Sequence, residues 1–171
     1  MLLLKKIKLE VKFSIMNDKS KFMMRAIELS IQSAKTKGGP FGCVIVKDNK
    51  IIAEGYNQVT SSNDPTAHAE IVAIRNACKN QNNFFLKGCD LYSTCEPCPM
   101  CLSAIYWARI DKVYYANTRD DARKIDFDDS LIYSEINKKI NERKIPMIQI
   151  MRNEALKAFE FWDKKKDKVK Y

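Results

Sequence analysis

The sequence contains no apolar run that approaches the roughly 18 residues a membrane-spanning helix needs. Its first residues, MLLLKKIKLEVKFSI, lack the apolar stretch of about 7–15 residues of a secretory signal, and they contain no arginine of the kind found in transit peptides. There is no internal repeat and no low-complexity tract in the 171 residues. These absences favour a single globular domain in the cytoplasm, with reduced thiols and no membrane attachment.

The surplus of positive charge, +9 in total, is concentrated at the two ends of the chain. Residues 1–15 and residues 163–171 each carry a net +3, which leaves only +3 for residues 16–162. Lysine-rich ends of this kind are usually solvated tails. The distribution therefore weakens the nucleic-acid interpretation that a net charge of +9 suggests. We interpret residues 1–15 as an extension ahead of a domain at 16–171, although their alternation also permits an edge strand.

Strands and helices alternate along the domain, which predicts a layered α/β/α architecture. We expect helices over residues 18–36, from Thr66 through the apolar period that reaches Cys78, over 98–108 and over 153–167, and a helix that is entered within 126–138; strands are expected at 43–47, 51–56, 89–94, 112–117 and 147–151. Residues 60–65 are expected to form a loop, and Thr66 to be the N-cap of the helix after it. In the first helix, Phe22, Ala26, Leu29 and Ala34 are expected to face the core.

His68, the only histidine, stands in the segment DPTAHAE, and a lone helical histidine is by default a structural residue. A second segment, TCEPCPMC, contains Cys98 and Cys101 in a C-x-x-C pair that is typical of zinc or redox sites. Residues three apart lie on one face of a helix, and Pro99 suits the first helical turn. The positive end of that helix favours thiolate, the form that ligates metal.

Cys95 is the competing candidate for a fourth ligand, because Cys95, Cys98 and Cys101 also open an iron–sulfur pattern. That pattern needs a further cysteine, and none follows Cys101. We therefore expect three protein ligands, His68, Cys98 and Cys101, and a fourth position left for water, as in catalytic zinc sites. Cys95 is expected to end a strand and point elsewhere. The remaining cysteines, Cys43, Cys78 and Cys89, fall in core-like segments and receive no function.

Glu70 favours a catalytic over a structural metal. It follows His68 by two residues, so it leaves the first helical turn on another side and cannot stack beside the histidine as a ligand. It can instead reach a water at the metal and move its proton, since zinc lowers the pKa of water from 15.7 to about 7. The joint pattern H-x-E followed by P-C-x-x-C is the signature of zinc-dependent nucleobase deaminases.

The segments DPTAHAE, EPCPMC and AIYWARI resemble the cytidine-deaminase-like superfamily. Two branches share them, the tRNA adenosine deaminases and the small guanine deaminases of bacterial type. GGPFGCVIV, SNDPTAHAEIVAIRNAC, FDDSLIYSEI and the ending KKKDKVKY are similar to the guanine deaminases, over residues 16–171. This resemblance implies an α/β fold with three layers and a mixed five-stranded sheet.

The resemblance also implies a reaction, the hydrolysis of guanine to xanthine and ammonia by attack at C2. It assigns His68, Cys98 and Cys101 to zinc and Glu70 to proton transfer. Three further positions match family residues: Asn57 binds the purine, Asp129 assists at the departing amine, and Phe41 lines the base pocket. Each has a plain structural alternative, as a turn residue, a helix cap and a core residue respectively.

The C-terminal segment, residues 153–171, combines Phe159, Phe161 and Trp162 with a lysine-rich tail that ends in Tyr171. In the resembling family this segment crosses to a neighbouring subunit of a homodimer, and the terminal aromatic residue closes that subunit's pocket. The implied partners are a small purine base and a second copy of the chain, and not a membrane or a nucleic acid. The alternatives are an adenosine deaminase acting on tRNA, a deaminase of another aminopurine or a guanine nucleoside, and a non-catalytic zinc module.

Overall fold

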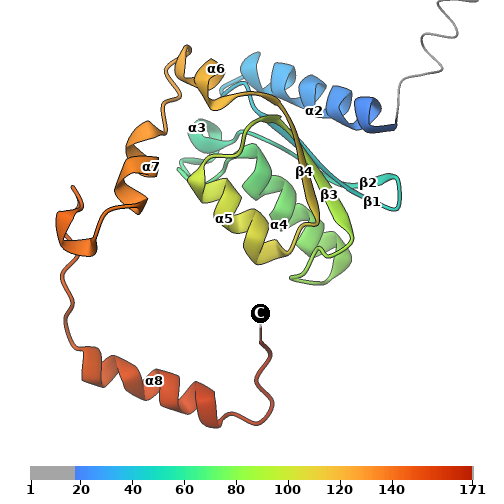
Figure 1. Ribbon diagram of the computed structural model, residues 1–171. Helices are drawn as coiled ribbons and strands as arrows, with labels where there is room; N and C mark the ends of the chain where they lie inside the picture. Colours follow the sequence, from blue (N-terminus) through green and yellow to red (C-terminus); the bar gives the residue numbers. More distant parts are fainter. Residues whose placement is uncertain (1–17, 171) are drawn as a thin grey trace, which may run out of the picture. The chain divides into compact units, whose positions relative to one another are not determined.

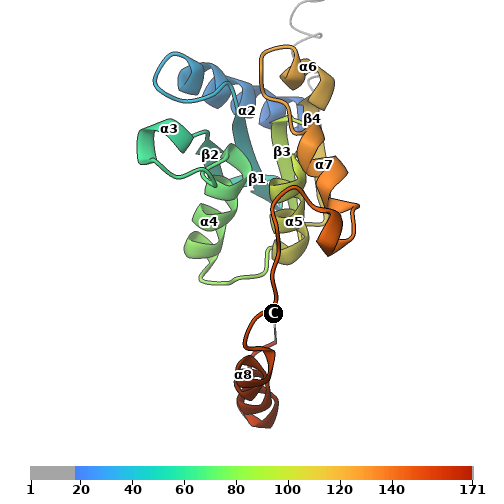
Figure 2. The same ribbon diagram turned by 90° about the vertical axis from the view of Figure 1, so that its left-hand side faces the viewer.

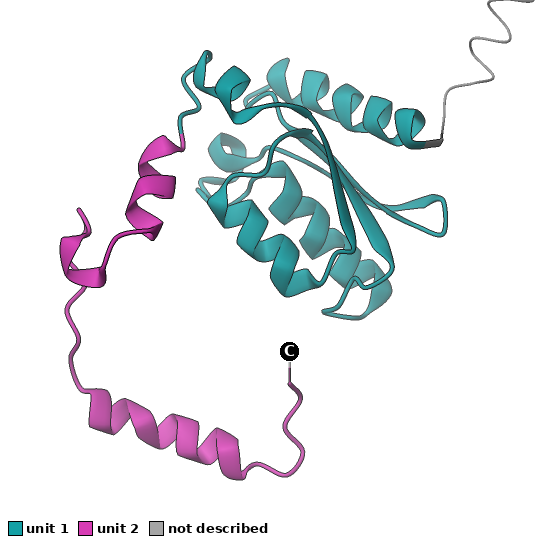
Figure 3. Ribbon diagram, viewed as in Figure 1, with its two compact units in different colours: residues 1–128 teal, residues 129–171 magenta. Residues whose placement is uncertain are grey.

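The computed structural model describes residues 18–170. The extension at 1–15 and Tyr171 therefore lie outside the described residues. The chain divides into two compact units, one that ends at Asp128 and one that begins at Asp129 (Figure 3). The first unit contains the whole sheet and all three predicted metal ligands.

The first unit is built on a mixed sheet with the strand order β2-β1-β3-β4. β1 (Gly42–Lys47) pairs antiparallel with β2 (Lys50–Tyr56) and with β3 (Cys89–Cys95), and β3 pairs in parallel with β4 (Lys112–Asn117). The β1–β2 hairpin turns at residues 48–49, both with positive φ (48° and 60°), as expected of a turn that matches the twist of its strands. The predicted hairpin is confirmed.

Helices cover both faces of this sheet, so the predicted α/β/α layering is confirmed (Figure 1). α2 (Asp18–Ala34) lies on one face, and α4 (Ala69–Gln81) and α5 (Pro99–Ala108) lie on the other. Alternate strand residues supply the two core layers. The layer under α2 contains Phe22, Ala26, Leu29, Val44, Val46 and Tyr92, and the layer under α4 and α5 contains Cys43, Ile45, Ala73, Ala77, Leu91, Ile105 and Ala108.

The fifth strand predicted at residues 147–151 is wrong. Across residues 18–170 the sheet has four strands, and residues 147–151 adopt no regular structure. A strand persists only where its backbone groups find partners, and no ladder forms here within the described chain. Ile148 and Ile150 are 82% and 76% exposed, so their apolar side chains lack the burial that the alternating pattern suggested. β4 consequently stands at one edge of the sheet.

Two smaller predictions also differ from the structure. The loop expected at residues 60–65 begins inside a short helix, α3 (Val59–Ser62), which ends at Asn63 in the left-handed region. Ala34 is exposed, and Ser33 is buried in its place, because the first helix ends at Ala34 and its last turn places Ser33 inward. The Ser33 hydroxyl is satisfied by a hydrogen bond to the Asn57 carbonyl.

After β4 the first unit ends in α6 (Arg119–Arg123), which the sequence did not predict and which a capping box of Thr118 and Asp121 begins. The second unit contains α7 (Ser130–Ile136), a 3-10 turn (Ile140–Glu142) and α8 (Arg152–Lys164). α8 ends three residues before the predicted 167. None of the helices in residues 18–170 combines the length and the apolar character of a membrane span.

Candidate metal centre and active site

The start of α4 differs from the prediction in a way that matters for the site. His68, and not Thr66, is the N-cap, with an extended backbone (φ −67°, ψ 156°). Thr66 is held before the helix because its N–H and its hydroxyl both donate to Asp64 Oδ1, at 2.8 and 2.6 Å. Its side chain is therefore occupied in the preceding turn. His68 is placed at the entrance of the helix as a result.

The second pair of ligands begins α5. Cys98 is the N-cap (φ −64°, ψ 168°) and Pro99 follows in the first turn, as predicted. α4 and α5 lie side by side on the same face of the sheet, so the two N-caps come together (Figure 2). Gly55 of β2 permits this arrangement: a Cβ there would lie 2.3 Å from the carbonyl oxygen of Ala69.

His68, Cys98 and Cys101 form a compact group whose ligand atoms all lie within 4.8 Å of one another. His68 Nδ1 is 3.6 Å from Cys98 Sγ and 3.5 Å from Cys101 Sγ. A tetrahedral zinc site with ordinary bond lengths requires a nitrogen–sulfur separation of about 3.6 Å. The three side chains are thus already spaced for zinc, and their donor set is one that zinc prefers.

The protonation of this group also fits a cation. The hydrogen bond from the Cys101 thiol, with His68 nearby, lowers the pKa of Cys98 to about 4. Because the Cys101 thiol donates this hydrogen bond to Cys98 and is also buried, the pKa of Cys101 is raised. The hydrogen bond with Cys98 raises the pKa of His68, against the opposing effect of burial. Without a metal the pair therefore retains one proton, and zinc would supply the positive charge that lets both thiols ionise.

Glu70 is buried beside the three ligands, with 6% of its surface exposed. Its Oε1 accepts a hydrogen bond from the Ser93 hydroxyl at 2.9 Å, and its Oε2 lies 3.5 Å from Cys101 Sγ. Burial raises the pKa of this carboxyl above its ordinary value. A carboxylate that holds a proton readily and faces the metal group suits the predicted role in proton transfer.

Cys95 is not part of the group, as the sequence predicted. It is the last residue of β3, and its Sγ lies 3.6 Å from the carbonyl oxygen of Thr118. Cys43 and Cys89 are buried in the core and Cys78 lies at its border, also as predicted. The structure forms no disulfide within residues 18–170.

Asn57 and Phe41 form a second cluster in the first unit. Asn57 is 6% exposed and donates its backbone N–H to the Phe41 carbonyl at 3.1 Å. Gln58, the next residue, donates to the carbonyl of Ala67, which precedes His68. This hydrogen bond ties the Asn57 segment directly to the entrance of α4. The segment that contains Asn57 is therefore held beside the entrance of α4, and the role of Asn57 in substrate binding stays a prediction.

Two residues that the sequence did not single out complete these clusters. Phe127 packs edge-on against Phe41, with ring centroids 4.9 Å apart, and so enlarges the aromatic surface beside Asn57. Ser93 provides the buried donor to Glu70. One feature of the sequence could have indicated Ser93: it is a hydroxyl residue on a buried strand, five residues before Cys98, the first cysteine of the metal-binding pair.

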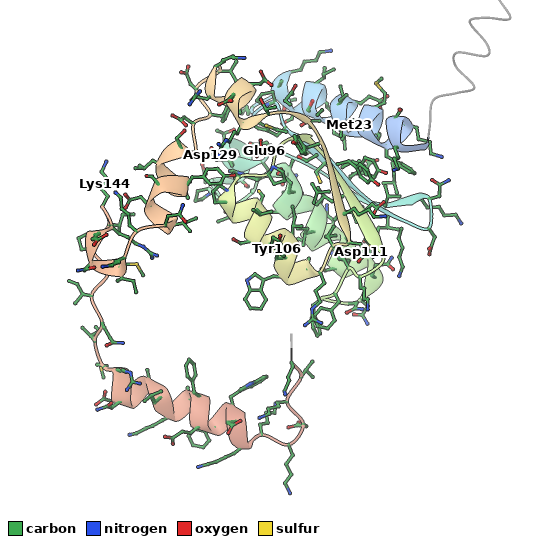
Figure 4. All side chains as sticks on the ribbon, in the orientation of Figure 1. Met23, Glu96, Tyr106, Asp111, Asp129 and Lys144 are labelled. Atoms are coloured by element: carbon green, nitrogen blue, oxygen red, sulfur yellow. The ribbon has the colours of Figure 1, made fainter. Side chains whose placement is uncertain are left out.

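The other predicted site residues belong to the second unit or lie beyond the described chain. Asp129 stands at the N-cap of α7 (Figure 4). Its side chain makes no capping hydrogen bond. Its backbone carbonyl instead accepts from Ile132 and Tyr133. Asp129 therefore remains a predicted catalytic residue, and Tyr171 a predicted substrate-binding residue.

Comparison with known proteins agrees with this geometry. The model of the cytidine and deoxycytidylate deaminase zinc-binding region matches residues 16–117, a range that contains both clusters except Phe127. A guanine deaminase of Bacillus subtilis is 53% identical over 151 residues, which cover 88% of this chain and 97% of the relative. A tRNA-specific adenosine deaminase of Buchnera aphidicola is 37% identical over 150 residues, with the same coverage of 88% and 97%.

A solved structure has a similar fold. The X-ray structure of the Bacillus subtilis guanine deaminase has a TM-score of 0.87 to this chain, at 52% sequence identity. The match covers 91% of this chain and 99% of that one. The likeness therefore extends over almost the whole length of both proteins.

Proposed function

This chain belongs to the cytidine and deoxycytidylate deaminase family, and we propose that it is a zinc-dependent hydrolase that converts guanine to xanthine and ammonia. The observation that carries the choice of substrate is the difference in identity over nearly equal spans. The chain is 53% identical to a guanine deaminase and 37% identical to a tRNA-specific adenosine deaminase, each over 88% of its length. The substrate is then a small purine base.

His68, Cys98 and Cys101 would hold the zinc, and its chemistry there would be to lower the pKa of a water to about 7. The water oxygen adds to C2 of guanine, and the bond from C2 to the exocyclic nitrogen breaks. Glu70 takes the proton of the water and passes it to the departing amine, so that ammonia leaves as a neutral molecule. The Oε2 atom, 3.5 Å from Cys101 Sγ, is the oxygen that faces the reaction.

Asn57 is proposed to orient the purine through its amide N–H₂ group. Its Oδ1 already accepts hydrogen bonds from the backbone N–H groups of Gly39 and Val59, both at 3.3 Å. The donor end of the amide therefore remains for the substrate, and it selects a hydrogen-bond acceptor such as a ring nitrogen or the carbonyl of guanine. We also propose that Phe41 lines the base pocket and that Asp129 assists the departure of the amine.

Guanine is expected to be deaminated faster than cytidine, guanosine or a tRNA anticodon stem-loop, on the order of 10²-fold in kcat/KM. A buried site built to hydrogen-bond one base leaves its polar groups unpaired with another. The measurement is ammonia release from the purified zinc protein with each substrate, together with xanthine formation from guanine. Inosine formation in the stem-loop without xanthine from guanine would transfer the proposal to tRNA adenosine, and preference for guanosine would transfer it to the nucleoside.

The C-terminal segment, residues 153–171, is proposed to pack on a second copy of the chain in a homodimer. Within α8, Phe159 and Phe161 are 73% and 79% exposed and Trp162 is 44% exposed. Three large aromatic side chains within four residues need an apolar surface to cover them. If two copies of the chain exchange their C-terminal segments symmetrically, each copy provides that surface for the other, and the assembly closes as a dimer. Tyr171 would then cover the pocket of the partner. The compartment proposed for such an enzyme is the cytoplasm, which keeps its cysteines reduced.

Deletion of Lys164 to Tyr171 is expected to lower kcat/KM for guanine on the order of tenfold, which corresponds to one lost contact of about 1.4 kcal/mol. Zinc content should not change, because no ligand lies in the deleted segment. Tyr171→Ala should reproduce much of the loss, and Tyr171→Phe, which keeps the ring, should not. Activity and the mass of the particle in solution are the measurements. A truncated protein that is monomeric and fully active would contradict the proposal.

A further inference from the structure

Ser93 joins the strand that precedes the metal ligands to the proton carrier. Its hydroxyl donates to Glu70 Oε1 at 2.9 Å and accepts from the backbone N–H of Cys95 at 3.4 Å. Ser93 is 1% exposed and Glu70 is 6% exposed, so bulk water does not compete for either hydrogen bond. Because the hydroxyl accepts from a backbone N–H and donates its own hydrogen to a carboxylate, it is held in one orientation.

The two oxygens of the Glu70 carboxylate have different partners. Ser93 donates to Oε1, and Oε2 lies 3.5 Å from Cys101 Sγ. The backbone N–H of Glu70 also donates to the carboxylate. A zinc-ligating cysteine is a thiolate and has no hydrogen to donate. In the metal-loaded protein Ser93 is therefore the side chain that continues to hold the carboxylate.

We propose that Ser93 is a positioning residue for deamination: its hydroxyl holds Oε1 of Glu70 so that Oε2 stays directed at the metal group. The inference rests on the proposed function of Glu70 as the proton carrier. Ser93 approaches the carboxylate from β3 and is not a member of the metal-ligand group. It therefore acts on the reaction only through Glu70, by keeping one oxygen in place for proton transfer.

Ser93→Ala in the zinc-loaded full chain is expected to lower kcat for guanine by roughly 10- to 100-fold, as is usual when a supporting hydrogen bond in a metal site is lost. KM should change by less than about twofold, because Ser93 does not meet the substrate. Zinc should remain at one ion per chain. The matched control is Ser30→Ala, a buried serine whose hydroxyl donates to the Ile27 carbonyl within α2, and it should leave kcat unchanged.

Two further variants separate positioning from a general structural role. Ser93→Thr keeps a hydroxyl on the same Cβ and should recover most of the lost kcat. Glu70→Gln removes the proton carrier, so adding Ser93→Ala to it should cause little additional loss in single-turnover rate. A Ser93→Ala variant with full kcat would overturn the proposal, and so would a drop of equal size in both backgrounds.

The stability of the zinc-loaded protein provides a second readout, which does not depend on turnover. In chemical denaturation of the zinc-loaded protein, Ser93→Ala should shift the unfolding equilibrium more in the wild-type background than in a Glu70→Ala background, which has no acceptor for the Ser93 hydroxyl, by on the order of tenfold. This difference between the two shifts tests whether Ser93 and Glu70 interact, even when no xanthine forms. Absence of xanthine with the wild type would reject the proposed function, whereas additive shifts in stability would reject the positioning role.

Discussion

Replacing Glu70 by Gln is expected to lower the rate of guanine deamination by roughly 10²–10⁴-fold, the range typical of lost acid–base catalysis, while the zinc stays bound. Gln has nearly the same shape and can still accept a hydrogen bond from Ser93. It cannot take a proton from water and return it to the departing amine. Glu70 is also outside the group of three ligand atoms, so the substitution removes no donor from the metal.

The stability of the metal-free protein should not fall in this variant. Burial raises the pKa of Glu70, which means that the folded state disfavours its charged form. This group therefore costs stability as the pH rises above its unfolded pKa, and a neutral Gln removes that cost. A variant that is inactive, holds zinc and unfolds no earlier than the wild type has lost chemistry and not structure.

A matched control is Glu54→Gln. Glu54 is also a carboxylate, but it pairs with Arg25 through two hydrogen bonds of 2.7 and 2.8 Å on the surface of β2 and α2. The substitution should leave turnover unchanged. The measurements are kcat for xanthine formation and zinc per chain for both variants. Substantial turnover by Glu70→Gln would show that another group moves the proton.

The metal ligands could be predicted from the sequence because each is placed by local rules. Pro99 in the first turn and the three-residue spacing put Cys98 and Cys101 on one face of α5, and both features are visible in a short stretch of sequence. The β1–β2 hairpin was likewise predictable, since two apolar strands flank a two-residue turn. The joint pattern H-x-E followed by P-C-x-x-C added what local spacing cannot provide, namely that His68 belongs with these cysteines.

The errors arise where a distant or competing partner decides the structure. Thr66 is a good N-cap by residue type, but its hydroxyl is bound to Asp64, and His68 takes the position instead. Residues 147–151 have the alternation of a strand, but alternation does not show which edge, if any, they pair with. Ser93 and Phe127 act through contacts 23 and 86 residues away along the chain, which no local pattern reveals.

Loss of the metal is expected to have the largest effect on activity. Cys98→Ala should remove zinc and lower turnover by more than about 10³-fold, because the water then returns from a pKa of about 7 to one of 15.7. The matched control is Cys95→Ala, three residues earlier, whose sulfur faces the Thr118 carbonyl and not the metal group. This control should keep one zinc per chain and normal activity. Metal analysis that finds iron, or zinc lost from the Cys95 variant, would reject the three-ligand site.

A chelator applied to the wild type separates a catalytic metal from a structural one. The two core layers on either side of the sheet are formed by residues of α2, α4, α5 and the strands, and none of the three metal ligands belongs to either layer. Removing zinc should therefore abolish turnover while the circular dichroism of the helices and strands is retained, and added zinc should restore activity. A structural zinc behaves differently, since its binding energy is part of the folding energy and the chelated protein unfolds. With three protein ligands and a proton-carrying carboxylate beside the open position, this site is expected to follow the catalytic pattern.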